Sequence, residues 1–325
     1  ALKAAVAADV EPFKDNVVKE PLISDESALK GSKVVKSVKD ESLGFTEWTL
    51  ANGIKVVIKQ TPYQADNIGV EAISDGGAAV FANDMYYSAQ MLGGVMSMSG
   101  ISKFSASDLR KQLSGKNARA NVGVGTYQHA IEGTAALKDA ETMFQLMYLN
   151  FTAPRFSEDD FATLMKRYDA MLANQLTNPD FVFGQQLMKT LYSDNYRRQQ
   201  LTPEILSSVK LERMQDIHSK LYGNAQGFRF TIYGNMSPED LKPLVEKYIG
   251  SLPKGKKATD WIKENCISVA DGQVEKTVNI KMQDPKSTVH QLYTAYLPYD
   301  IKTGVTLDVA NYILDMIYTK TIHEE

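Results

Sequence analysis

The chain of 325 residues has 43% hydrophobic residues, 36 basic and 39 acidic residues, and a formal net charge of −3. This length suits two domains with sizeable cores, and the near-neutral charge gives no reason to expect nucleic acid as a partner. Cys266 is the only cysteine, which excludes an internal disulfide and a thiolate metal cluster. The sequence contains no apolar run of about 18 residues, so we expect no membrane span.

Residues 1–43 are rich in Lys, Asp, Glu, Ser and Val and show little sustained periodicity, which predicts an extended linker or wrapping arm. Regular patterns begin at residue 44. Asn52-Gly53 lies between two strand-like runs within residues 45–60 and predicts a β-hairpin. A third alternating run over 67–74 precedes a Gly-Gly pair and a helix that starts near Met85.

The remaining patterns also fall into strands and helices. Strands are expected within 118–137 and 227–234, and helices over 105–113, 138–150, 161–176, 206–222 and 238–249. Strands and helices alternate in groups rather than one by one. This order favours an α+β domain, an antiparallel sheet with helices packed on one face, over a doubly wound parallel sheet. We place this domain at 44–255 and a linker at 256–273.

An internal repeat extends the pattern into the last part of the chain. At an offset of 222 residues Val56 meets Val278, and Leu92 meets Leu314. The order strand, turn, strand, helix then recurs over some 35 residues, unless the sparse identities arise by chance. The apolar spacing of 305–325 continues almost to the last residue with no stop signal. We therefore expect 274–325 to be the start of a second homologous α+β domain, cut within a longer protein.

These segments resemble the pitrilysin/insulinase family of zinc peptidases, to which the mitochondrial processing peptidases belong. The resemblance rests on "LANGIKVVI", then "GG" and a helix, and on "LSSVKLERMQDIHSKLYGNAQGFRFTIYGNMSPEDLKPLVEKYIGSLP". It covers 45–255 well and 274–325 as the start of a following domain. It implies a metallopeptidase half in a long member of bacterial type.

In active domains of this family the first helix carries H-x-x-E-H, in which two histidines bind zinc and the glutamate is the general base. The register of the stretch "MYYSAQML" puts Tyr86 at the first histidine, Ala89 at the glutamate and Gln90 at the second histidine. A neutral phenol, a methyl group and an amide are poor substitutes. The family's third ligand, a glutamate on a later helix, would fall near 166–169, where the alignment is open.

The resemblance therefore implies a degenerate metal helix with no catalytic residue, metal ligand or cofactor in this chain. Zinc and the general base would belong to a catalytic half on the same chain or on a partner subunit. This chain, inactive alone, would help to enclose and bind an extended peptide. In such halves an Arg and a Tyr after the last helix polarise the scissile carbonyl. His323 lies near the expected arginine, and the tyrosine would fall beyond the last residue. The expected location is the cell envelope or periplasm of a bacterium.

Alternative interpretations remain open at this point. On the eight residues of "MYYSAQML" alone, an ordinary packing helix fits as well. A non-proteolytic scaffold or interaction subunit of the same fold is a second function, and an unrelated enzyme is a third. The motifs of serine penicillin-binding enzymes, S-D-N at 193–195, S-x-x-K at 207–210 and K-T-G at 302–304, are present in the wrong order. None of the four histidines has a partner at ligand spacing.

Overall fold

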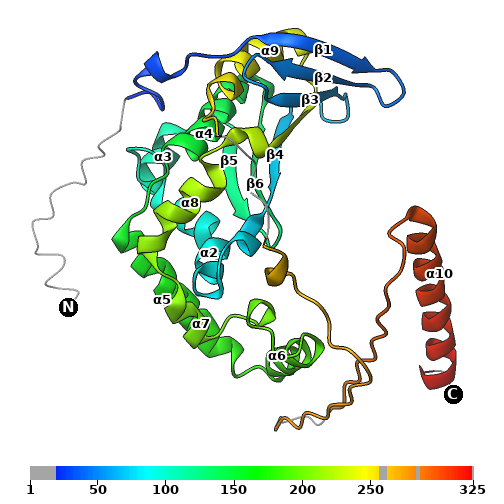
Figure 1. Cartoon of the computed structure of the whole chain (residues 1–325). Helices are drawn as coiled ribbons and strands as arrows, with labels where there is room; N and C mark the ends of the chain where they lie inside the picture. Colours follow the sequence, from blue (N-terminus) through cyan, green and yellow to red (C-terminus); the bar gives the residue numbers. More distant parts are fainter. Residues whose placement is uncertain (1–19, 256–261, 283–285, 324–325) are drawn as a thin grey trace, which may run out of the picture. The chain divides into compact units, whose positions relative to one another are not determined.

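The computed structural model describes residues 20–255, 262–282 and 286–323 (Figure 1). The chain divides into two units, Ala1–Ala270 with Val274–Val278, and Asp271–Gln273 with Asn279–Glu325. The strands are β1 Val34–Asp40, β2 Phe45–Leu50, β3 Lys55–Gln60, β4 Ile68–Asp75, β5 Ala118–Val124, β6 Gln128–Ala135 and β7 Arg229–Gly234. The α-helices are α2 Asn83–Ser99, α3 Ala106–Gln112, α4 Ala140–Thr152, α5 Glu158–Gln175, α6 Pro179–Leu191, α7 Pro203–Ser208, α8 Met214–Tyr222, α9 Pro238–Lys247 and α10 Ile301–Tyr318.

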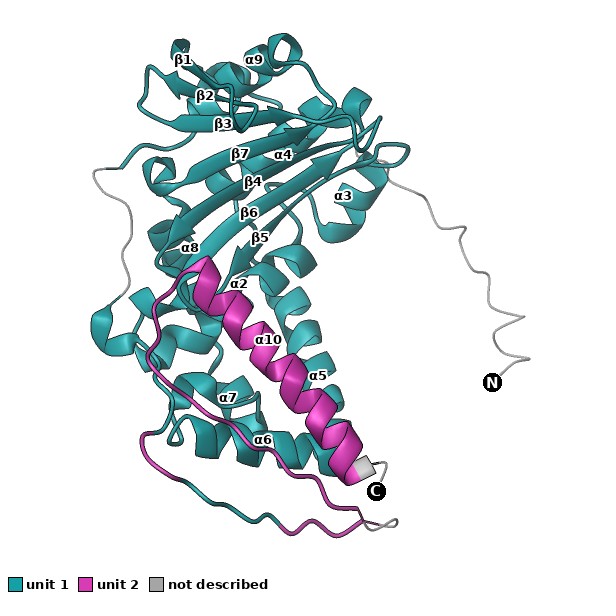
Figure 2. Ribbon diagram, turned by 90° about the vertical axis from the view of Figure 1, so that its right-hand side faces the viewer, with its two compact units in different colours: residues 1–270, 274–278 teal, residues 271–273, 279–325 magenta. Residues whose placement is uncertain are grey.

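All strands of the described chain lie in unit 1 and form one sheet in the order β1-β2-β3-β7-β4-β6-β5 (Figure 2). Neighbouring strands are antiparallel except β3 and β7, which are parallel. The last strand of the unit inserts between β3 and β4, which the sequence order alone would have paired. The expectation of an α+β fold is confirmed, with this one parallel pair as the departure from an antiparallel sheet.

Side-chain alternation gives the sheet a buried face and an open face. Val56 on β3, Val70 on β4 and Ile232 on β7 point to the buried face and are at most 1% exposed. Helices α2 and α4 pack on this face of β5, and the buried residues of α8 and α9 join the same core. The helices therefore cover one face of the sheet, as the sequence predicted.

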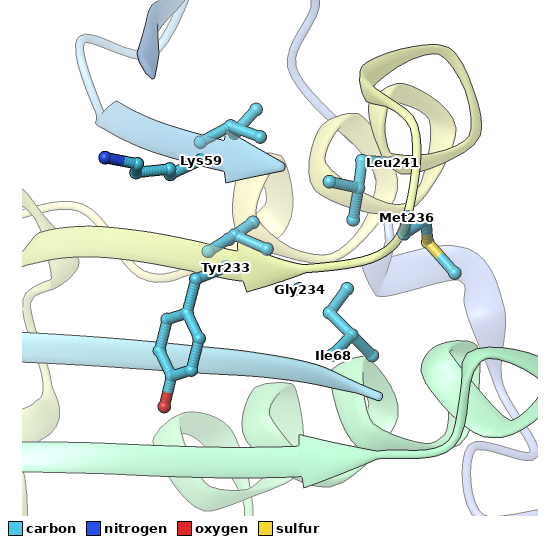
Figure 3. A pocket seen from close by; sticks show the side chains of 8 residues that line it. Lys59, Ile68, Tyr233, Gly234, Met236 and Leu241 are labelled. Carbon is cyan, nitrogen blue, oxygen red and sulfur yellow. The ribbon is translucent and has the colours of Figure 1, made fainter. Parts of the chain in front are cut away.

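The open face carries polar and charged side chains from the alternate positions. Tyr233 of β7 extends across the neighbouring strand β4 (Figure 3), where it covers Gly69. A Cβ on Gly69 would lie 2.5 Å from the tyrosine ring, so the ring takes the space that a side chain would need. The hollow beside it, lined by Ile58, Ile68, Met236 and Leu241 among others, is filled by these side chains and offers no room for a ligand.

The segment before residue 44 takes part in the sheet. Residues 34–40, part of the predicted linker or wrapping arm, form the edge strand β1, which pairs with β2. Three of the seven residues in this strand are valines, but the lysines between them hide the alternation. The N-terminal boundary of the sheet therefore lies ahead of residue 44.

Two helical segments differ from the sequence expectation. The region 206–222 is not one helix: α7 ends at Ser208, and α8 begins at Met214. Helix α6 was missed because Asn178-Pro179 looked like a stop signal. Here the Asn178 side chain accepts a hydrogen bond from the Asp180 N–H and Pro179 takes the first helical position, so the same two residues begin the next helix.

Unit 2 contains α10, which confirms the terminal helix, followed by a π-helical turn over Thr319–His323. The two strands expected from the internal repeat, near 278–282 and 289–296, do not form among its described residues. A strand needs a hydrogen-bonding neighbour, and unit 2 offers none in the described part of the chain. Its apolar side chains are correspondingly exposed: Leu307, Val309, Tyr312, Ile313, Leu314 and Ile317 are each at least 42% exposed. No helix within the described ranges is long and apolar enough for a bilayer crossing.

Glu246 on α9 attaches the start of β1 to the domain. Its Oε1 accepts a hydrogen bond from the Val34 N–H at 3.0 Å and its Oε2 accepts one from Lys33 Nζ at 2.7 Å. Burial raises the pKa of Glu246, but these contacts outweigh burial and hold the pKa below its usual value. The backbone contact is the stronger anchor, because Lys33 is largely in solvent.

We expect Glu246→Ala to lower the free energy of unfolding by about 1–2 kcal/mol, because the Val34 N–H loses a buried acceptor. Glu246→Gln retains an acceptor oxygen and should lose less. Urea denaturation measures both, with Glu239→Ala, an exposed position on the same helix, as the control. Equal losses for the three variants would contradict this anchoring role.

Candidate functional site

Helix α2 follows a Gly-Gly turn that wraps around the β5–β6 connection. Gly77 has φ +55°, and a Cβ there would lie 2.5 Å from the Gly125 carbonyl oxygen. The N–H groups of Gly76, Ala78 and Ala79 donate to carbonyls of the β5–β6 connection at 2.7–2.9 Å. Only glycine fits this position, so the Gly-Gly pair fixes where α2 begins relative to the sheet.

The three degenerate-motif positions lie together on α2. Tyr86 and Ala89 are almost fully buried, at 1% and 0% exposed, and Gln90 is half-buried. Gln90 Nε2 donates to the Tyr86 hydroxyl oxygen at 3.0 Å. The two side chains at the histidine positions therefore hydrogen-bond to each other across one helical turn, and Ala89 presents a methyl group to the core.

This arrangement does not fit zinc. Neither a tyrosine hydroxyl nor a glutamine amide is a usual zinc ligand. Ala89 has no atom that could take a proton from a bound water. Among the described residues, no three His, Cys, Asp or Glu side chains gather closely enough to bind a metal.

Tyr87 connects α2 to a short 3₁₀ turn, η4, Tyr196–Arg198. Its hydroxyl shares its hydrogen between the carbonyl oxygens of Tyr196, at 2.6 Å, and Gln199, at 3.0 Å. The ring also packs edge-to-face on Tyr196, with centroids 5.0 Å apart. Burial raises the pKa of Tyr87, so the phenol stays protonated and donates.

Arg197, in η4, hydrogen-bonds to groups at the start of α2. Its NH2 group donates to the Phe81 carbonyl at 2.7 Å and its Nε to Asn83 Oδ1 at 2.8 Å. The guanidinium carbon lies 4.7 Å from the centroid of the Tyr86 ring. Arg197 is only 7% exposed, and burial lowers its pKa. A cation thus lies directly against the first ligand position of the degenerate motif.

Asn265, from the segment after the domain, reaches the same turn. Its Nδ2 donates to the carbonyls of Ala79 and Phe81 at 2.7 and 3.0 Å. Tyr87, Arg197 and Asn265 were not predicted from the sequence. Their partners lie more than 100 residues away in the chain and are mostly backbone carbonyls, which leave no motif.

His129 is a buried histidine on β6 whose two ring nitrogens both contact backbone. Nδ1 accepts from the Gly77 N–H at 3.3 Å, so the proton is on Nε2, which donates to the Leu221 carbonyl at 2.8 Å. Burial lowers the pKa of His129 to about 4. His218 is likewise buried and bonds the Asn150 carbonyl at 2.7 Å. Both histidines have structural contacts, and neither adjoins a metal-ligating side chain among the described residues.

The other predicted positions lie on separate elements of the two units. Residues 166–169 lie on α5, and His323 ends the π-helical turn of unit 2. In the S-D-N motif, Ser193 and Asp194 have positive φ in the loop after α6, and Ser207 of the S-x-x-K motif donates its hydroxyl hydrogen to the Glu204 carbonyl. These features give the serine-enzyme motifs no shared geometry.

Fold and site together define an α+β domain whose helix α2 offers no metal-binding chemistry at Tyr86, Ala89 or Gln90. Comparison with known proteins gives the family. The family described as "Peptidase M16 inactive domain" matches residues 208–317. The "Probable zinc protease PqqL" of Escherichia coli is 22% identical over 290 residues, which cover 86% of this chain and 30% of that protein. These matches support the resemblance to the pitrilysin/insulinase family of peptidases, and over residues 208–317 to its inactive domain.

Two solved structures show the same fold. The crystal structure of the periplasmic protease PqqL from Escherichia coli has a TM-score of 0.66 at 18% identity, covering 82% of this chain and 29% of that one. The peptidase M16 inactive domain from Pseudomonas fluorescens has a TM-score of 0.56 at 17% identity, covering 67% and 53%. The chain thus spans less than a third of the length of the curated relatives it matches.

The buried His129 predicts a loss of stability in weak acid. The unfolded imidazole titrates near pH 6.5 and the folded one near 4. Above pH 6.5 both states are neutral and the stabilisation is complete. As the pH falls from 6.5 to 4 the unfolded state alone binds the proton, so the free energy of unfolding should fall by up to roughly 3 kcal/mol.

Urea denaturation between pH 7.5 and 4 measures this slope, and NMR titration of the ring measures the pKa directly. His129→Gln should have a flatter slope than the parent protein, while His218, whose pKa is also lowered by burial, contributes to both. A His129 pKa near 6.5 would contradict the prediction.

Proposed function

We propose that this chain is part of the non-catalytic half of a zinc metallopeptidase. It would enclose and bind an extended peptide for a catalytic half that carries H-x-x-E-H, on the same chain or on a partner subunit. The observation that carries the proposal is the hydrogen bond between Gln90 and Tyr86, which occupies both histidine positions of the motif without a ligand. The zinc-protease names of its relatives support the assignment of the metal to the other half.

The open face of the sheet is the surface that we assign to the peptide. It presents Lys55 and Lys59 on β3, Tyr233 on β7 and Glu71 on β4, a mixture of cationic, aromatic and acidic groups within a few strands. Such a surface suits an unfolded chain of mixed sequence better than a single small ligand, which needs an enclosed pocket.

The two sheet edges are less suited to adding a peptide strand. The edge strand β1 is interrupted by a register shift between Val34 and Lys36 and is rich in lysine, both of which discourage strand pairing. On β5 the Ala120 carbonyl accepts from Asn150 Nδ2 at 3.1 Å, and Gly93 of α2 packs against the Val122 carbonyl. These contacts compete with an added strand.

The periplasm of a bacterium is the location that we propose, since the PqqL structure is described as a periplasmic protease. This location fits the role of an enzyme half that handles peptides.

The test combines metal analysis, hydrolysis and binding on this chain. We expect no stoichiometric zinc by mass spectrometry, no cleavage of a fluorogenic peptide, and measurable binding of a labelled unstructured peptide by fluorescence anisotropy. Binding should weaken several-fold in the open-face variant Tyr233→Ala with Lys59→Glu. It should not change in Glu246→Gln, which alters the contact between α9 and the start of β1. Chelator-sensitive cleavage, or no peptide binding, would overturn the proposal.

A further inference from the structure

The guanidinium of Arg197 lies in a cage of electron-rich groups at the first turn of α2. The Phe81 carbonyl and Asn83 Oδ1 lie within hydrogen-bond distance, and the Ala78 carbonyl accepts a longer contact of 3.5 Å from NH1. The Tyr86 ring completes the cage on another side. Backbone carbonyls, a side-chain amide oxygen and an aromatic face are the neutral groups that proteins use to solvate a cation.

No acidic side chain neutralises this buried charge within the part of the chain that the structure describes. The nearby Asp84 is paired with Arg213, at 3.4 Å, and is largely exposed. Buried arginines are usually paired with carboxylates. Here oriented dipoles replace the counter-ion.

The N-terminus of α2 is an unfavourable place for the Arg197 cation unless neighbouring groups stabilise its charge. The N-terminus of a helix has a partial positive charge that repels cations. The carbonyls of Ala78 and Phe81 belong to the turn just before α2 and point at Arg197, which offsets that repulsion. The turn preceding the helix is therefore shaped around a positive group.

We propose that Arg197 is the resident cation of the degenerate metal site, where it orders the first turn of α2 and excludes a divalent metal from the Tyr86–Gln90 face. The positive charge beside α2 then comes from the Arg197 side chain and not from a metal ion. The missing ligands and the Arg197 guanidinium both lower the affinity of this face for a metal. The guanidinium does so because a charge within about 5 Å of a would-be metal ligand opposes binding of a second cation.

The first test removes the Arg197 side chain and adds small cations that can take its place. Arg197→Ala should lower the melting temperature by roughly 5 °C or more, because three acceptors and an aromatic face lose their contact with the guanidinium. Millimolar methylguanidinium should restore part of the loss, and methylammonium should restore much less, because only the planar ion can reach several acceptors at once. Arg198→Ala is the matched control: its guanidinium lies over Tyr192, outside the cage, and should not respond to either ion.

The second test measures the exclusion of metal and does not depend on the stability of Arg197→Ala. The variant Tyr86→His with Gln90→His places two histidines at i and i+4, the spacing at which two side chains share one helix face and bind zinc. Adding Arg197→Met should raise its zinc affinity at least about tenfold by isothermal titration calorimetry, since the competing charge is gone. Adding Arg198→Met should leave the affinity unchanged.

Two results would overturn the proposal. One is equal rescue of Arg197→Ala by methylguanidinium and methylammonium, or equal loss in the two alanine variants. The other is a zinc affinity of the His pair that does not depend on residue 197. Neither readout involves peptide binding or hydrolysis, so failure here leaves the non-catalytic role to be judged by its own test.

Discussion

The close approach of helix α2 to the edge of the sheet is the constraint on which the rest of unit 1 depends. A Cβ on Gly93 would lie only 2.2 Å from the Val122 carbonyl oxygen, so the helix can sit this low on β5 only with glycine there. The Gly77 turn fixes the start of α2 against the β5–β6 connection. With the helix held at this depth, Tyr86 and Ala89 face the core, and any chemistry on that side depends on what these two residues can do.

The resemblance assigns the ligand positions of a metal helix to Tyr86 and Gln90, which are buried and half-buried on α2. Removing the ligands from a metal site would leave buried polar groups without partners. Each unpaired group would cost about as much free energy as a lost buried hydrogen bond. Here the main polar side chains on α2 have partners, while Arg198 Nε in η4 is buried without one among the described residues. Gln90 bonds Tyr86, Tyr87 bonds two carbonyls of η4, and Arg197 returns from η4 to the turn before α2. These hydrogen bonds attach α2 to η4 and to the turn before the helix.

The sequence predicts local structure well where the signal is short in range. Asn52-Gly53 and the alternation in β4 each depend on neighbours within a few residues, and these elements are where the patterns put them. The insertion of β7 between β3 and β4, and the path from Arg197 to Phe81, depend on partners more than 100 residues apart. The degenerate motif was visible only through family resemblance, since Tyr86, Ala89 and Gln90 are ordinary residues of a packing helix.

Helices α2 and α10 show how far a helical pattern determines burial. The repeat at an offset of 222 residues aligns Leu92 with Leu314, and both form regular helix. Leu92 is 0% exposed and Leu314 is 42% exposed. The difference comes from the surroundings: α2 packs on β5, and the described part of unit 2 has no strand to offer α10. Apolar burial is the main favourable term in folding, so a helix of this pattern is stabilised chiefly by the sheet beneath it. The shared pattern thus specifies a helix in both units, while burial of its apolar side depends on the strands that precede it.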